Sequence, residues 1–424
     1  MIGSYLNGTL LLDGVPVDRI AETVGTPFYL YSSSEMTRAY TAYETALQGL
    51  GVRICYAMKA NSNIAIIRHF DRLGAAMDVV SAGELERCLA AGIPGDRIVF
   101  SGVGKSEAEM AAALEAGIDQ INVESPDELL VLSRVADSMG REAPIALRVN
   151  PDVDAKTHAK ITTGRSENKF GIDIDQAPAL YAKAAELPGI RPLGLAVHIG
   201  SQLLDLAPYR AAYSHLADLT RHLRGSGLPV ERLDLGGGIG IAYADRPAPD
   251  LTEFAEIVRS SVSELGCHLT IEPGRSLVGR AGWLVTRVMY VKNGTSRRFV
   301  ILDSAMNDLI RPAMYEALHE MIPVKQPVEN PTRGSFDIVG PVCETGDTFA
   351  RQYEMVVPSA GDLYAFADAG AYGAVMASEY NSRPLAPEVL AHDGEFSVIK
   401  KRPSLAERLA GEAIPQWLAG PVTP

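Results

Sequence analysis

The sequence predicts an eight-stranded parallel α/β barrel joined to a second, mainly antiparallel β domain. Apolar runs alternate with helical stretches rich in Ala, Leu and Glu as far as residue 275, a pattern typical of βα units. These units recur at a period of roughly two dozen residues between 82 and 140. After residue 275 the pattern changes to short strand-like runs separated by Pro and Gly, with room only for short helices.

The repeat is clearest in three consecutive helices. Each begins at a serine followed three residues later by glutamate, as in a capping box: Ser81, Ser106 and Ser125. The third also has proline as its first residue, where a missing N–H costs nothing. Each ends at or near a glycine suited to the left-handed position after a helix: Gly92, Gly117 and Gly140.

The wider pattern contains about eight strands, the number that closes a TIM-type (β/α)8 barrel. They are Arg53–Lys59, Ala75–Val80, Arg97–Ser101, Gln120–Glu124, Ile145–Val149, Leu193–Ile199, Arg232–Leu235 and His268–Glu272. The connection after the fifth strand, 151–192, is long and includes the polar stretch THAKITTGRSENKFG. A βα insertion of this length is typically functional. The barrel is predicted to span residues 28–275.

Residues 276–424, with 1–27, are predicted to form the β domain. The expected strands are Val285–Val291, Arg298–Leu302, Phe336–Val339, Leu363–Ala367 and Phe396–Lys400, with Thr9–Leu12 from the N-terminal segment. A short helix fits around Ser404–Leu409.

Composition narrows the class of protein. The net charge of −13 speaks against nucleic acid or an anionic membrane surface as a partner. Four scattered cysteines, without a CxxC pair, favour neither a disulfide framework nor a structural zinc site. No apolar run is long enough to cross a membrane, and the first residues do not resemble a signal peptide. A cytoplasmic enzyme without a metal is therefore expected.

Barrel enzymes place their sites at the carboxyl ends of the strands. The residues found there are polar or ionisable, and we expect them to converge: Lys59, Asp78, Arg148, His198, Ser201, Gly237, Gly238, Glu272, Gly274 and Arg275. Lys59 follows an apolar run, and a lysine in a dry pocket has a lowered pKa and can form a Schiff base. A lysine that extends into solvent from the strand end is the plain alternative.

Three further features of the barrel have two interpretations each. Gly236–Gly238 can present backbone N–H groups to a phosphate after strand seven, or form an ordinary tight turn. Glu272 can hold a pyridine nitrogen protonated, or pair with Arg275. His198 can stack on a planar cofactor, or be structural.

The second domain contributes two motifs. In CETGD, Cys343 can act as a proton donor beside the carboxylate of Glu344, or be a buried small residue in a turn. Arg311 offers a guanidinium suited to a carboxylate.

Taken together, these motifs resemble the barrel-type, alanine-racemase-like decarboxylases that use pyridoxal phosphate (PLP). In chain order they are YAMKAN, THAKITTGRSENKFGI, HIGSQ, LGGGIG, EPGR, LIRPAMYEALH, CETGD and GAYG, and they cover nearly the whole chain. The resemblance implies that Lys59 carries the cofactor, Glu272 contacts its pyridine nitrogen and His198 stacks on its ring. Ser201, Gly238 and the Glu272–Arg275 segment would hold the cofactor, and Tyr372 would touch both its phosphate and the substrate.

The resemblance also implies substrate contacts and a shared site. Arg275, Arg311 and Tyr315 would bind the carboxylate at the non-reacting end, and Glu344 the amine there. Cys343 would be the general acid, reaching the site of a neighbouring subunit in a homodimer, so that the β domain supplies substrate-binding and interface residues.

The implied reaction is decarboxylation of meso-2,6-diaminopimelate to L-lysine and CO2. PLP decarboxylases of other basic amino acids or of antibiotic-pathway substrates remain alternatives, as does a non-catalytic PLP carrier. A racemase is disfavoured, because a glutamate at position 272 promotes the electron sink that a racemase suppresses.

Overall fold

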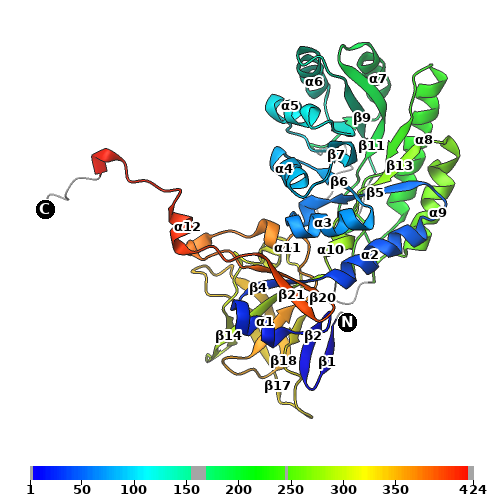
Figure 1. The fold of residues 1–424 in the computed structure, drawn as a ribbon. Coiled ribbons are helices and arrows are strands. Elements are labelled where there is room, and N and C mark those ends of the chain that lie inside the picture. Colours follow the sequence, from blue (N-terminus) through cyan, green and yellow to red (C-terminus); the bar gives the residue numbers. More distant parts are fainter. Residues whose placement is uncertain (1–2, 154–168, 244–246, 419–424) are drawn as a thin grey trace. The chain divides into compact units, whose positions relative to one another are not determined.

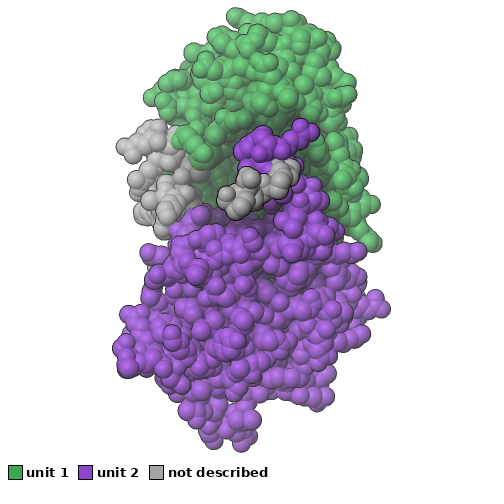
Figure 2. All heavy atoms as spheres, turned by 90° about the vertical axis from the view of Figure 1, so that its left-hand side faces the viewer, with its two compact units in different colours: residues 1–2, 32–283, 367–375 green, residues 3–31, 284–366, 376–424 purple. Residues whose placement is uncertain are grey.

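The computed structural model describes residues 3–153, 169–243 and 247–418. The described chain divides into two compact units, coloured separately in Figure 2. One contains residues 32–283 and 367–375, and the other contains residues 3–31, 284–366 and 376–418. Each unit has its own sheet and its own apolar core.

The first unit is a closed barrel of eight parallel strands, which confirms the predicted fold class. The strands are β5 (Val52–Ala57), β6 (Ala76–Val79), β7 (Ile98–Phe100), β8 (Gln120–Val123), β9 (Ala143–Asn150), β11 (Ile190–Val197), β12 (Arg232–Asp234) and β13 (His268–Ile271). They pair in chain order, β13 returns to β5, and β8 to β9 completes the ring. A two-residue strand, β10 (Ile172–Asp173), adds to β9 within the long connection after the fifth barrel strand. Residues 154–168 of that connection, which include most of the polar stretch, lie outside the described residues.

Helices alternate with these strands along the chain (Figure 1). They are α2 (Ser33–Ala46), α3 (Ile64–Leu73), α4 (Ala82–Ala90), α5 (Glu107–Glu115), α6 (Pro126–Ser138), α7 (Ala177–Glu186), α8 (Ala207–Gly225), α9 (Leu251–Val262) and α10 (Arg275–Val278). The barrel strands are almost fully buried, because aliphatic side chains fill both their faces.

The predicted helix starts are right, but only one is a complete capping box. At α4, α5 and α6 the serine accepts the N–H three residues on. Of the three glutamates, only Glu109 also accepts the backbone N–H of its own N-cap serine, Ser106. Glu84 and Glu128 instead accept the N–H one residue further back, from Val80 and Glu124. Both glutamates therefore fix the strand-to-helix turns beside the barrel mouth.

The strand that leads to Lys59 ends earlier than predicted. β5 stops at Ala57, and Met58–Ala60 form a 3-10 turn. The backbone N–H of Ala57 bonds the carbonyl of Pro273, which ties this turn to the end of β13. Lys59 therefore projects from a turn at the strand end.

The segment 367–375, which the sequence analysis placed in the β domain, packs with the barrel. The reason is a set of backbone contacts: the N–H of Tyr372 bonds the carbonyl of Ala60 at 2.8 Å, and Asn61 donates to the carbonyl of Gly370. A side chain at Gly370 would collide with the carbonyl of Val278 at 2.0 Å. Glycine is required there for the close approach that brings Tyr372 to the barrel.

The second unit contains the predicted, mainly antiparallel β domain. Its nine-stranded sheet contains β4 (Phe28–Ser32), β14 (Gly282–Asn293), β15 (Arg298–Leu302), β16 (Met321–Pro323), β17 (Arg333–Val339), β18 (Thr348–Val356), β19 (Leu363–Phe366), β20 (Glu388–His392) and β21 (Glu395–Lys400). β15 and β17 are parallel, and the other pairings specified for this unit are antiparallel. A smaller sheet holds β1 (Ser4–Leu6), β2 (Thr9–Leu12) and β3 (Val15–Pro16).

Three helices complete the second unit: α1 (Val17–Val24), α11 (Arg311–Tyr315) and α12 (Leu405–Leu409). The predicted short helix corresponds to α12. This helix begins with a complete capping box formed by Ser404 and Glu407. Among the described helices of both units, none is long and apolar enough to cross a membrane.

Candidate active site

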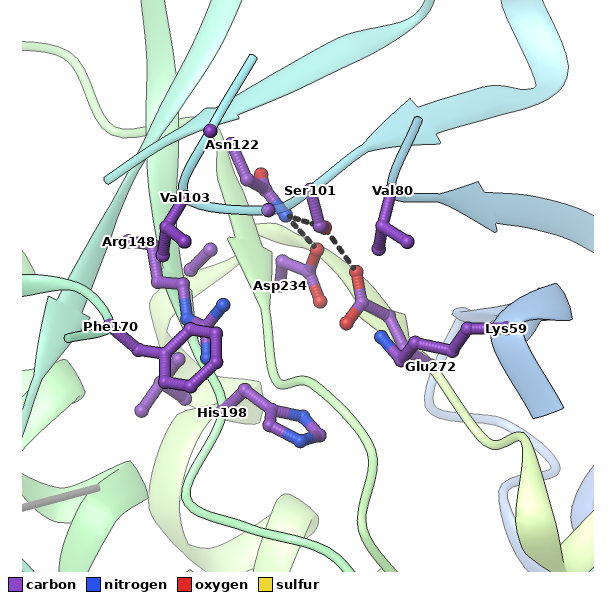
Figure 3. Close-up of a pocket in the computed structure, with 14 residues that line it drawn as sticks. Lys59, Val80, Ser101, Val103, Asn122, Arg148, Phe170, His198, Asp234 and Glu272 are labelled. Atoms are coloured by element: carbon purple, nitrogen blue, oxygen red, sulfur yellow. Dashed lines mark hydrogen bonds between the residues drawn. The ribbon is translucent and has the colours of Figure 1, made fainter. Parts of the chain in front are cut away.

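A cavity of about 380 Å³ opens at the carboxyl ends of the barrel strands (Figure 3). Its lining includes residues from all eight strand ends and from the segment before β10: Lys59, Val80, Ser101, Asn122, Arg148, Phe170, His198, Asp234 and Glu272. Four of the predicted site residues, Lys59, Arg148, His198 and Glu272, therefore share one cavity.

Lys59 is held by a carboxylate. Its Nζ lies 2.9 Å from Oδ2 of Asp78, which is fully buried on β6. Burial lowers the pKa of Lys59, but the charges of Asp78 and Glu272 outweigh it, so the net shift is upward. The expectation of a lowered pKa was therefore wrong for the protein without cofactor. Desolvation by itself would lower this pKa, but the carboxyl groups of Asp78 and Glu272 face the ammonium group.

Glu272 lies near a second carboxyl group of the same cavity, that of Asp234 at the end of β12 (Figure 3). Burial, followed by the charges of Asp234 and Asp78, raises the pKa of Glu272 well above its ordinary value. The predicted alternative, a salt bridge from Glu272 to Arg275, is not among the ion pairs of the described residues. Glu272 thus points into the cavity as an acid beside Lys59 (Figure 3).

His198 is kept neutral. Burial, and then the charges of Arg148 and Lys59, hold the pKa of His198 well below its ordinary value. Its Nδ1 lies 3.2 Å from the backbone N of Gly237, which donates the hydrogen bond. A neutral ring fixed in this way offers a flat apolar face to the cavity.

A second group of predicted residues surrounds Arg275. This buried guanidinium donates to the hydroxyl oxygens of Ser201 at 3.1 Å and Tyr243 at 3.3 Å, and lies 4.7 Å from the ring centre of Tyr372. Its Nε is buried without a hydrogen-bond partner among the described residues. The cluster thus combines a cation, hydroxyl groups and an unused donor, which is the chemistry that binds an anion.

Close backbone contacts explain why positions 236–238 are all glycine. A Cβ at Gly237 would lie 2.0 Å from the carbonyl of Glu272, and one at Gly238 would lie 2.2 Å from that of Gly200. Gly238 also has a φ of 106°, which other residues rarely adopt. A Cβ at Gly274 would likewise lie 2.9 Å from the carbonyl of Ala57. These glycines let the ends of β5, β11, β12 and β13 approach closely, and the N–H of Gly237 is bonded to His198.

Arg148 belongs to a buried network that shapes one wall of the cavity. It donates to Glu124 at 2.8 Å and lies 5.0 Å from the ring centre of Phe170. Glu124 also accepts the backbone N–H groups of Gly102 and Gly171. One carboxylate thereby connects the loops after β7, β8 and β9.

Lys105 supports the same wall of the cavity through buried hydrogen bonds. Its Nζ is almost fully buried and donates to Glu128 at 2.7 Å and to the carbonyls of Gly102 and Asn122. We expect Lys105→Met to destabilise the protein by about 3–5 kcal/mol, because the Glu128 carboxylate would remain buried without its cation. Urea denaturation followed by far-UV circular dichroism measures the change.

A matched control is the exposed pair Arg134–Glu107, at 3.4 Å. Arg134→Met should change the free energy of unfolding by no more than about 1 kcal/mol, since exposed pairs contribute little. Equal effects of the two substitutions would show that Lys105 does not stabilise the wall.

In the second unit, Arg311 begins α11 and is buried, with its Nε 3.4 Å from Nε2 of His319. Tyr315 ends the same helix and is half-buried. Glu316 follows with a φ of 55°, so the helix stops after little more than one turn. The motif therefore presents an arginine and a tyrosine at opposite ends of one short helix.

Cys343 and Glu344 are exposed on a tight loop, so Cys343 is not the buried small residue of the alternative interpretation. The loop is organised by Asp347, whose carboxylate accepts the N–H groups of Met306 and Val342, each at 2.7 Å. Asp347 therefore positions the loop that carries Cys343 and Glu344, a role that the sequence alone did not indicate. The nearest sequence signal is its place at the end of CETGD, in a Gly-containing turn.

Ser101, Asn122 and Asp234 also line the cavity but were not predicted as site residues. All three lie at the ends of strands, so the strand-end rule could have found them. The third and fourth predicted strands carry none of the recognised motifs, and Asp234 precedes the glycine run without belonging to it, so none of the three was assigned a role.

Pyridoxal phosphate fits the residues of the barrel. Lys59 supplies an amine, Glu272 a carboxyl group for a ring nitrogen, and His198 a flat face. Arg275 has an unused buried donor beside Ser201 and the glycine run. Within the described ranges, no cluster of His, Cys, Asp or Glu is arranged to hold a metal ion.

Comparison with known proteins agrees with this chemistry. The family described as pyridoxal-dependent decarboxylase, pyridoxal binding domain, matches residues 33–279. Diaminopimelate decarboxylase from Zymomonas mobilis is 46% identical over 420 residues, 98% of this chain and 99% of the relative. The chain belongs to the diaminopimelate decarboxylase family. The enzyme of that name from Neisseria meningitidis serogroup B is 47% identical over 95% of this chain and 97% of its own.

Solved structures of the diaminopimelate decarboxylase family share the whole architecture. The Helicobacter pylori enzyme complexed with L-lysine has a TM-score of 0.89 and 40% identity, covering 93% of this chain and 98% of that one. The M. jannaschii enzyme in complex with L-lysine has a TM-score of 0.93 and 35% identity, covering 98% of each chain. Barrel and β domain are therefore both family features.

Proposed function

We propose that this protein catalyses the decarboxylation of meso-2,6-diaminopimelate to L-lysine and CO2. Similarity across nearly the full length to proteins named diaminopimelate decarboxylase is the observation that carries the proposal. The barrel site supports it, because Lys59, Glu272 and His198 line one cavity. The L-lysine bound in the related structures is the product of this reaction.

The barrel residues have distinct roles in this proposal. When bound at Lys59, pyridoxal phosphate supplies the electron sink that accepts the charge left by departing CO2. Asp78 contacts the ammonium group of Lys59 and would keep this side chain in position, while Glu272 would contact the ring nitrogen and His198 would pack on the ring. Arg148 holds the cavity wall through Glu124.

The cofactor phosphate is proposed to bind where the unused donor of Arg275 lies. Ser201 and Tyr372 already contact this guanidinium, and Gly237, Gly238 and Gly274 allow the backbone to approach closely. A phosphate needs several such N–H and hydroxyl donors and little side-chain volume.

We assign the β domain to substrate recognition and the dimer interface. Arg311, Tyr315 and Arg275 would bind the carboxylate at the non-reacting end, and Glu344 the amine there. Cys343 would protonate the carbon from which CO2 has left, in the site of the partner subunit of a homodimer. Its exposure on the Asp347-organised loop suits a residue that acts on another molecule. The division at 27/28 and 275/276 and the cytoplasmic location remain predictions.

Purified protein with PLP should release CO2 from meso-diaminopimelate and form L-lysine, and do so far more slowly with ornithine, arginine or lysine. Amino-acid chromatography measures the L-lysine formed, and trapping measures the CO2 released. Release from one of the other amines would keep the chemistry but overturn the substrate. No release from any of them, with PLP bound at Lys59, would favour an antibiotic-pathway substrate or a carrier.

A further inference from the structure

Asp234, at the end of β12, and Glu272, directly after β13, line the same cavity (Figure 3). Both are buried, with Asp234 only 1% exposed, and they are linked through Asn122, which donates to Asp234 and to Ser101, and through Ser101, which donates to Glu272. Two buried carboxyl groups this close together cannot both ionise cheaply. The pair therefore carries one proton, whereas two isolated carboxyl groups would both be ionised.

The surrounding donors place that proton on Glu272. Oδ1 of Asp234 accepts the N–H of Gly236 at 3.0 Å, and Oδ2 accepts Nδ2 of Asn122 at 3.0 Å. The orientation of Asn122 is fixed, because its Oδ1 accepts Nε2 of Gln120 at 2.8 Å. N–H donors favour the ionised form of the carboxyl group that they contact.

Glu272 has a weaker set of donors and a more negative surrounding. Its Oε1 faces the hydroxyl of Ser101 at 3.4 Å. Burial, then Asp234 and Asp78, raise the pKa of Glu272, whereas Lys59 lowers it. These are the charged groups that face Glu272 from β12, β6 and the Lys59 turn. The donors therefore stabilise the carboxylate form of Asp234 more than that of Glu272, which favours Glu272 as the carrier of the proton.

We propose that Asp234 is a positioning residue that stores a proton on Glu272 until the cofactor binds. The O–H bond of Glu272 then breaks, and its proton passes to the lone pair of the pyridine nitrogen. Glu272 becomes the carboxylate that holds the pyridinium, and no external acid is needed. Because the backbone N–H of Gly236 donates to Asp234, Asp234 also connects Glu272 to the glycine run. The identity of the recipient rests on the proposed function, whereas the stored proton does not.

The stored proton can be seen without cofactor or substrate. Infrared spectra of the cofactor-free protein, with and without ¹³C-labelled glutamate, separate neutral carboxylic acids from carboxylates. We expect a glutamic-acid band at about pH 8, where ordinary glutamates are ionised, and expect Glu272→Gln to remove it. In Asp234→Asn the titration midpoint of this band should fall by about 1–3 pH units, because the adjacent negative charge is gone.

Glu84 provides a matched control, since it is another largely buried glutamate facing Asp78 and Lys59, and burial raises its pKa to about 7. Glu84→Gln should leave the Glu272 band and its midpoint in place. An unchanged midpoint in Asp234→Asn would overturn the role of Asp234. A wild-type spectrum without the band would overturn the stored proton, even if Asp234→Asn fails to fold.

Cofactor binding supplies a second readout. Calorimetry in buffers of different ionisation enthalpy counts the protons exchanged when PLP binds. At a pH between the two midpoints, Asp234→Asn should take up about one more proton per site than wild type, because its Glu272 begins ionised. Equal proton counts would contradict the transfer from Glu272. Failure of the decarboxylation assay alone would affect only the proposed function.

Discussion

Replacing Lys59 with alanine is expected to lower kcat by at least about 10³-fold, the range seen when a positioned proton-transfer group is lost. The effect should be larger than that of any other single barrel substitution, because Lys59 is both the proposed covalent attachment point and an amine in contact with the reacting centre. Asp78 would also be left buried without its cation. Steady-state CO2 release measures the loss.

The covalent link is tested separately. After borohydride reduction, mass spectrometry of the wild type should find the cofactor on the peptide that contains Lys59, and find none there in Lys59→Ala. Lys183→Ala is the matched control, because Lys183 is exposed at the end of α7 and should have no role in the site. Cofactor attached to another lysine in wild type would refute the assignment.

Cys343→Ala should lower kcat by about 10²–10⁴-fold if Cys343 is the general acid. Binding of PLP should be unaffected, since no proposed cofactor contact is removed. Cys267→Ala is the control, because Cys267 is partly buried in the barrel and contacts Arg224, away from the cavity-lining residues. Unchanged turnover in Cys343→Ala would remove the thiol from the mechanism.

Mixing the two inactive variants tests whether the site is shared between subunits. In a heterodimer of Lys59→Ala and Cys343→Ala, one of the two sites has both wild-type residues, provided that Cys343 acts on the partner subunit. Random exchange of equal amounts should restore roughly a quarter of wild-type activity. No recovery, with subunit exchange shown by mass spectrometry, would mean that each chain uses its own Cys343.

The sequence by itself determined the strand order and much of the site. Apolar runs of fixed spacing predict the barrel strands, and serine and glycine mark the helix ends, because these signals depend on local hydrogen bonds and allowed φ values. The strand-end rule then placed Lys59, His198 and Glu272 at one rim, since parallel strands of a closed barrel all end on the same side.

Only the tertiary structure decided the charge states in the site. The shift of the pKa of Lys59 has the opposite sign to the sequence expectation, because Asp78, Glu272 and Tyr372 from other parts of the chain together outweigh desolvation. The role proposed for Asp234 depends on its hydrogen bonds from Asn122 and Gly236 and on its position near Glu272, and all of these are tertiary contacts. Sequence patterns record which residues recur along one element, whereas electrostatic coupling depends on distances between elements, and these exist only after the barrel closes.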